Sequence, residues 1–200
     1  AAGDCHRRSC RFGDACRSYE AAQRQAPLPL GALCRLGEVM VLDGRASEGR
    51  QYLQRVLQEG TEIQKLNAAV AMALSHVVEQ EHEEALKCCE LVLGMQGSLG
   101  QRPQFKLARL LQGLTQLRSG GSDAVDLAIR TLAVAAEHVA ESCQDAPANV
   151  GERAAEQTDQ QRRWAVMIYA TLAWAETLRG SFREADRRLS QAQHAAARLG

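Results

Sequence analysis

Apolar residues recur along this chain at intervals of three and four positions, as they do on amphipathic helices. The stretch 32–60, ALCRLGEVMVLDGRASEGRQYLQRVLQEG, shows two such patterns separated by Gly44. Runs of β-branched residues are short and rare, so strands are not expected. The pattern predicts an all-α fold, with helices at 1–11, 13–25, 29–43, 46–59, 62–79, 81–94, 102–118, 122–142, 150–179 and 182–198.

A longer period is superimposed on the helical one. The second helix of each predicted pair opens its apolar pattern with a small residue, found at Ala15, Gly49, Ala85 and Ala185, with a weaker copy at Ala124. These copies are 34, 36, 39 and 61 residues apart. The first helix of the pair carries a matching set of four residues. Each set begins sixteen residues before the copies at Gly49, Ala85, Ala124 and Ala185. The sets are Leu33, Leu36, Gly37 and Met40; Ala69, Met72, Ala73 and His76; Ala108, Leu111, Gln112 and Thr115; and Tyr169, Leu172, Ala173 and Glu176.

This layout resembles the tetratricopeptide (TPR) repeat family in degenerate form. That family places a large residue and Leu-Gly on the first helix, and small and aromatic residues on the second. The resemblance implies an α-solenoid of antiparallel helix pairs, a TPR-like right-handed superhelix of about five repeats. Gly44 and Gly180 stand where the family has its inter-helix turn. An irregular helical bundle with alanine-rich seams does not account for the spacings of 34 and 36 residues.

Gly37 interrupts an otherwise good helical pattern, at a helix-propensity cost of about 1 kcal/mol relative to alanine. We expect close packing of two antiparallel helices to offset this cost, because a side chain at Gly37 would push them apart. Gly49 is expected to play the same part from the second helix.

We interpret residues 1–200 as a single TPR-like α-solenoid segment, which starts in the middle of a repeat and belongs to a longer array. The 61-residue spacing places a polar insertion at 140–161, between the fourth and fifth repeats. Two interpretations of the insertion remain open. It either projects from the solenoid and contacts a partner, or forms a tolerated surface loop.

The charges balance, with 24 basic and 24 acidic residues, which argues against a generic nucleic-acid binder and a polybasic membrane patch. No apolar run approaches the ~20 residues of a membrane helix, and the first residues lack a signal-peptide core. The seven cysteines lack the spacing of a disulfide scaffold. We therefore expect an intracellular protein, cytoplasmic or nuclear.

Candidate chemistry is weak. Cys5, His6, Cys10 and Cys16 lie close together, but their spacing does not match a structural zinc site. Cys89 takes the aromatic position of its repeat and is expected in the core. No nucleophile arrangement, phosphate-binding loop or metalloprotease helix is present in the sequence. We predict no enzyme activity, no catalytic or metal-binding residue and no cofactor.

The resemblance implies a concave face lined by the first helices, which in TPR-like arrays holds an extended peptide or a helix. The residues predicted to contact a partner there are Arg35, Glu38, Asn67, Val70, Leu74, Lys106, Arg109, Gln116 and Trp174. Chaperone-binding TPRs grip a carboxylate with polar residues, but Leu74 and Gly113 stand where such residues would be needed. The apolar members of the set suggest burial of apolar partner side chains. Contact with neighbouring helices is the alternative.

The sequence thus predicts a non-catalytic protein–protein interaction scaffold, a subunit of a multiprotein complex. The expected partner is a protein, supplying an extended peptide or a helix, with no direct nucleic-acid or membrane binding. Homo-oligomerisation stays open. A ligand- or peptide-sensing regulatory domain is the first alternative, and a structural dimerisation module is the second.

Overall fold

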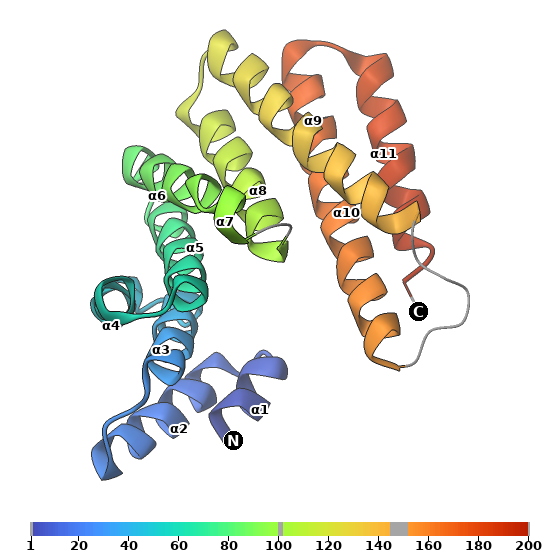
Figure 1. The fold of residues 1–200 in the computed structure, drawn as a ribbon. Coiled ribbons are helices and arrows are strands. Elements are labelled where there is room, and N and C mark those ends of the chain that lie inside the picture. The colour runs from blue at the N-terminus through green and yellow to red at the C-terminus, as the bar shows by residue number, and fades with distance from the viewer. Residues whose placement is uncertain (1, 100–101, 145–151, 200) are drawn as a thin grey trace. The chain divides into compact units, whose positions relative to one another are not determined.

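The computed structural model describes residues 2–99, 102–144 and 152–199, which form helices and no strand (Figure 1). The helices are α1 (Ala2–Arg8), α2 (Phe12–Gln25), α3 (Leu30–Leu42), α4 (Ala46–Glu59), α5 (Glu62–Val78), α6 (His82–Gly94), α7 (Gln96–Leu99), α8 (Pro103–Ser119), α9 (Ser122–Gln144), α10 (Glu152–Arg179) and α11 (Phe182–Ala196). The ten predicted helices are confirmed to within a few residues. The short α7 was not predicted, and α1 ends before the predicted boundary.

The turn that follows the first helix of a pair contains a residue with left-handed backbone geometry. Gly44 and Gly180 have φ of +84° and +83°, which confirms the predicted turns. Cys10 and Gln80 adopt φ of 54° and 62°, and they lie 34 residues before and 36 residues after Gly44. A non-glycine residue there costs roughly 1–2 kcal/mol, so the turn geometry is retained even where glycine is not.

The helices group into two compact units, unit 1 (1–104) and unit 2 (105–200). In unit 1 one cluster joins α2 to α3, and a second joins α3, α4 and α5. The first cluster is built from Ala15, Cys16, Tyr19, Leu36, Val39 and Met40. The second is built from Leu33, Cys34, Val41, Leu53, Val56, Ala68, Ala71 and Met72. Within unit 1, α2 therefore packs on α3, and the pair α3–α4 packs on α5, partly through predicted repeat positions such as Leu33, Leu36 and Leu53.

Gly37 and Gly49 bring α3 and α4 into backbone contact. A Cβ on Gly37 would lie 2.9 Å from the carbonyl oxygen of Gly49 and 2.7 Å from Cγ of Leu53. A Cβ on Gly49 would lie 2.6 Å from the carbonyl oxygen of Gly37. Real Cβ atoms do not approach so closely, so the predicted reason for these two glycines is confirmed.

In unit 2 one cluster of described residues joins α8, α9 and α10. Leu110, Leu132, Ile168 and Leu172 are its large, nearly inaccessible side chains. Most of the segment expected as an insertion, 140–161, is helical, because α9 runs on to Gln144 and α10 starts at Glu152. The rest of it lies outside the described residues.

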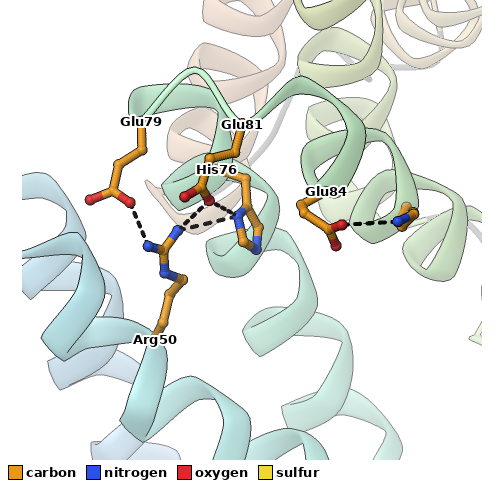
Figure 2. A network of polar contacts seen from close by, with 6 residues as sticks. Arg50, His76, Glu79, Glu81 and Glu84 are labelled. Atoms are coloured by element: carbon orange, nitrogen blue, oxygen red, sulfur yellow. Dashed lines mark hydrogen bonds and ion pairs between the residues drawn. The ribbon is translucent and has the colours of Figure 1, made fainter.

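Arg50 links the second helix pair to the third (Figure 2). It projects from α4 towards the turn between α5 and α6, where it donates hydrogen bonds to Glu79 and, at 2.7 Å, to Glu81. His76 lies 3.2 Å from Arg50 and 2.5 Å from the same Glu81 oxygen. The hydrogen bond with His76 lowers the pKa of Glu81, and the positive charge of Arg50 adds to this effect.

Two other junctions are bridged in the same way. Glu20 on α2 pairs with Arg45 in the turn between α3 and α4, at 2.8 Å. Asp126 on α9 lies 3.6 Å from Arg179 at the end of α10. Each ion pair joins the second helix of one pair to the end of the next pair's first helix. The second helix supplies a carboxylate at two of these junctions, Glu20 and Asp126, and a positive charge, Arg50, at the third.

Candidate partner-binding surface

The predicted contact residues of unit 1 lie on two neighbouring first helices. Arg35 and Glu38 are on α3, and Asn67, Val70 and Leu74 are on α5, which packs against α3. Arg35 is exposed, and Glu38, Asn67 and Leu74 are half-buried. Val70 is only 6% exposed, which leaves little of its side chain for a partner. Four of the five positions therefore present accessible atoms on adjacent helices.

Two residues of the first helix, α1, form ion pairs with the two charged residues of α3. Asp4 pairs with Arg35 at 2.9 Å, and Arg7 pairs with Glu38 at 3.5 Å. Tyr19 of α2 donates a hydrogen bond of 2.6 Å to Asp4, and burial together with this bond raises the pKa of Tyr19 to about 12. Arg35 is thereby oriented by a chain of polar contacts that starts in the core.

Burial raises the pKa of Glu38, against the opposing effect of Arg7 and Arg35. The carboxylate is therefore held in an environment that disfavours its charged form. On the next first helix, Asn67 accepts a hydrogen bond of 2.7 Å from Gln104. The polar residues of this surface are thus partnered within unit 1, and an external ligand would have to compete with those partners or add to them.

Three of the predicted residues in unit 2 lie on α8. Lys106 and Arg109 are half-buried, whereas Gln116 is only 5% exposed and offers little to a partner. The fourth, Trp174, lies on α10 and is 45% exposed. A large aromatic side chain with that much surface in solvent is the most accessible apolar group of the predicted set.

The helix α10 is apolar on two opposite faces. One face carries Ile168 and Leu172, which are inaccessible in the core of unit 2. The other carries Met167, Trp174 and Leu178, which are 48%, 45% and 53% exposed. A helix with one amphipathic face needs a single apolar stripe, so a second stripe on α10 leaves an apolar surface that the core of unit 2 does not cover. The prediction missed Met167 and Leu178, although their spacing from Trp174 marks a helical stripe.

The structure does not gather the residues weighed for chemistry. Cys5 and Cys10 are exposed while Cys16 is buried. Within the described ranges, no group of three or more His, Cys, Asp or Glu side chains could hold a metal ion. Cys89 is fully buried, as predicted, and burial raises its pKa to about 12. Among the residues that the structure describes, no helix is long and apolar enough to cross a membrane.

No protein-family model and no curated protein sequence matches this chain. Solved structures of MamA share its fold. A crystal structure of MamA has 16% sequence identity and a TM-score of 0.61, covering 98% of this chain and 95% of the MamA chain. The structure MamA MSR-1 C2 has 16% identity and a TM-score of 0.59, covering 99% and 94%.

MamA is a TPR-like helical-repeat protein. Similarity at 16% identity shows the fold alone, and it extends over nearly the whole of both chains. The predicted fold class, an all-α solenoid of TPR-like helix pairs, is therefore confirmed.

Proposed function

We propose that this chain is a non-catalytic protein–protein interaction scaffold, which binds a partner peptide or helix on its first helices. The exposed face of α10 carries the proposal. Trp174 lies there between Met167 and Leu178, turned away from the core of its unit. Exposed aromatic anchors of this kind are enriched among residues that dominate binding energy.

The surface of unit 1 supports the same proposal with different chemistry. Arg35 is exposed and oriented by Asp4, while Leu74 offers a half-buried apolar side chain on the neighbouring helix. A partner can bind such a surface with charge and apolar contacts together. The TPR-like fold adds weight, because helix pairs of this type build elongated surfaces suited to chains rather than small ligands.

Affinity purification of the tagged protein from its native cells, with quantitative mass spectrometry, tests the proposal. Two variants would be compared with the wild type, Trp174→Ala for unit 2 and Arg35→Glu with Leu74→Glu for unit 1. Leu91→Ala is the matched control, because Leu91 is a 49%-exposed apolar residue on the second helix α6. Circular dichroism would confirm that each variant keeps its helix content.

We expect stoichiometric partners that are retained by the Leu91→Ala control and reduced at least fivefold by one or both test variants. Partners that survive both variants would contradict binding on the first helices. If the wild type retains nothing, the scaffold function itself is wrong.

A further inference from the structure

The connection between α2 and α3 lines a pocket in unit 1. Residues 26–29 make this connection, whereas the shorter segment 60–61 joins α4 to α5. Its backbone is extended at Ala26 and Pro29, and the two prolines of the segment, Pro27 and Pro29, have no N–H group. Residues 26–28, the end of α2, the start of α3 and Arg55 of α4 surround a pocket of about 360 Å³.

We call Arg24, Pro27, Leu28, Leu33 and Arg55 the loop pocket. Leu33 is 2% exposed, and Leu28 is half-buried and packs against both apolar clusters of unit 1. The floor of the pocket is therefore part of the core. The walls belong to two adjacent helix pairs, α1–α2 and α3–α4, so the pocket lies between packed elements and is not the edge of a terminal pair.

Two arginines border the loop pocket, and none of the residues that line it is acidic. Arg24 is exposed and has no hydrogen bond or ion pair to any described residue. Arg55 hydrogen-bonds Glu59 through Nε, at 3.2 Å to each carboxylate oxygen, and its two terminal amino groups remain available. Arg24 lies in the last turn of α2, where its full charge exceeds the partial negative charge of the helix end, about half a charge. The available hydrogen-bond donors of both arginines suit a carboxylate.

The end of α2 adds free acceptors. The carbonyl oxygen of Gln23 lacks its usual donor four positions on, because that residue is Pro27. The carbonyls of Arg24 and Gln25 likewise accept no backbone hydrogen bond within the described part of the chain. An extended peptide can donate N–H groups to such acceptors, whereas a helix uses its own N–H groups internally. A volume near the lower end of ligand pockets, roughly 300–1,000 Å³, also suits one side chain better than a whole helix.

We propose that the loop pocket binds an extended acidic peptide of another protein. One apolar side chain of the peptide packs on Leu28 and Leu33, and neighbouring carboxylates pair with Arg24 and Arg55. The peptide backbone donates to the free carbonyls at the end of α2. This site goes beyond the function proposed above, because it lies at the ends of the second helices α2 and α4 and uses none of the residues assigned to the first-helix surface.

The test uses the whole 200-residue chain and a short peptide with one phenylalanine flanked by two glutamates on each side. Both peptide ends are capped, so that side chains supply all the carboxylates. Matched peptides replace phenylalanine with serine, or every glutamate with glutamine or arginine. Binding is followed by fluorescence anisotropy of labelled peptides. A benzophenone analogue of phenylalanine, cross-linked by light, locates the peptide by mass spectrometry.

We expect the acidic phenylalanine peptide to bind at low salt and to cross-link within residues 23–33 or at Arg55. The serine and glutamine peptides should bind at least about tenfold more weakly, because each lacks one of the two kinds of contact. The preference for glutamate over glutamine should shrink as salt screens the charges.

Arg24→Glu with Arg55→Glu should weaken binding of the acidic peptide at least about tenfold and should strengthen binding of the arginine peptide. Arg130→Glu with Arg183→Glu is the matched control, because both arginines are exposed on second helices of unit 2 and the change in net charge is the same. This control should bind the acidic peptide as the wild type does. Circular dichroism would check the helix content of both variants.

Three results would overturn the proposal: no binding at millimolar peptide, equal loss in the two double variants, or cross-links outside the loop pocket. So would a dimer in analytical ultracentrifugation that Arg24→Glu with Arg55→Glu dissociates, because a second copy would then fill the pocket. Binding that depends on Trp174, or on Arg35 and Leu74, but not on Arg24 and Arg55 would place the peptide on the first helices. This inference would then fail while the scaffold function stands.

Discussion

In unit 1 the edge of the pair α3–α4 that carries Leu53 lies beneath α5, whereas in unit 2 the corresponding edge of α10–α11, which carries Leu189, is exposed. Leu53 and Leu189 hold the same place in the repeat, yet one is inaccessible and the other is 45% exposed. The comparison shows that occupying a repeat position and being buried there are two different properties, which a repeat pattern alone does not distinguish. A position can be shaped for helix packing, and whether a helix occupies it depends on the neighbouring segment.

The two units also differ in how their helices touch. In unit 1 Gly37 and Gly49 allow backbone-to-backbone contact between α3 and α4. In unit 2 a Cβ on Gly113 would meet the side chain of Leu132, 2.6 Å from its Cγ. A side chain can rotate away and a backbone cannot, so unit 1 should tolerate changes at its glycines less well than unit 2 does.

The largest effect is expected from truncating the two equivalent leucines. Leu53→Ala should lower the free energy of unfolding by about 2–5 kcal/mol, because it leaves a cavity in the core. Leu189→Ala should change it by no more than about 0.5 kcal/mol, because the side chain is half in solvent. Urea denaturation followed by circular dichroism measures both. Equal losses would mean that the α11 edge is covered in solution.

The glycine contacts come next. Gly37→Ala should lower the free energy of unfolding by about 1–3 kcal/mol, because its Cβ would strike the backbone of α4. Gly113→Ala should cost less than about 1 kcal/mol, since Leu132 can rotate and alanine favours the helix. Gly94, which has nothing within 4 Å of its Cβ, supplies the control variant Gly94→Ala. A larger loss at Gly113 than at Gly37 would reverse the comparison.

The junction ion pairs should differ between units as well. Arg50→Gln should lower the free energy of unfolding by about 1–2 kcal/mol, because the Arg50 side chain is 17% exposed and contacts Glu79 and Glu81. Asp126→Asn should change it by less than about 0.5 kcal/mol, because Asp126 is 52% exposed and lies 3.6 Å from Arg179. Thermal unfolding at low and high salt measures both effects. Equal losses at the two junctions would show that burial of the arginine does not matter.

The smallest effect depends on pH. Burial raises the pKa of Glu38 above its ordinary value of 4.5, so the folded protein binds this proton more tightly than the unfolded chain does. The resulting stability is present below pH 4.5 and is lost as the pH rises through the folded-state pKa. Glu38→Gln should therefore be slightly more stable than the wild type at pH 7, by less than about 1 kcal/mol because the Glu38 side chain is 37% exposed and solvent screens its charge, with no advantage near pH 4. Unfolding curves of both proteins at pH 7 and near pH 4 measure this difference in stability. A mutant that is less stable at pH 7 would mean that the pairing with Arg7 outweighs burial.

Periodicity was enough to predict the helices, because apolar spacing and the turns at Gly44 and Gly180 are local properties of the chain. It also explained Gly37 and placed Cys89 in the core. The candidate site was harder. Helical register places Val70 and Gln116 on the first-helix face, but register does not reveal which part of that face is covered, and both residues are buried.

The contacts that orient the surface could not be predicted. Asp4 and Arg35 are 31 residues apart, and Arg50 meets residues 29 and 31 positions further on. Ion pairs over such distances depend on how the helix pairs stack, which no local pattern encodes. The exposed stripe of Met167 and Leu178 was different, because the spacing of these two residues from Trp174 is visible in the sequence.

The alternation of charge at the junctions bears on how a repeat protein changes during evolution. Repeats are gained and lost by unequal recombination, and a clean loss of α3 and α4 would set α2 beside the turn between α5 and α6. Glu20 would then face Glu79 and Glu81 in place of Arg45, and three carboxylates would repel one another. The shortened array would keep its apolar contacts between helix pairs, but the new junction would be destabilised by this charge repulsion. The polar contacts at the junctions thus favour one order of the helix pairs, because each pair carries charges that complement its own neighbour.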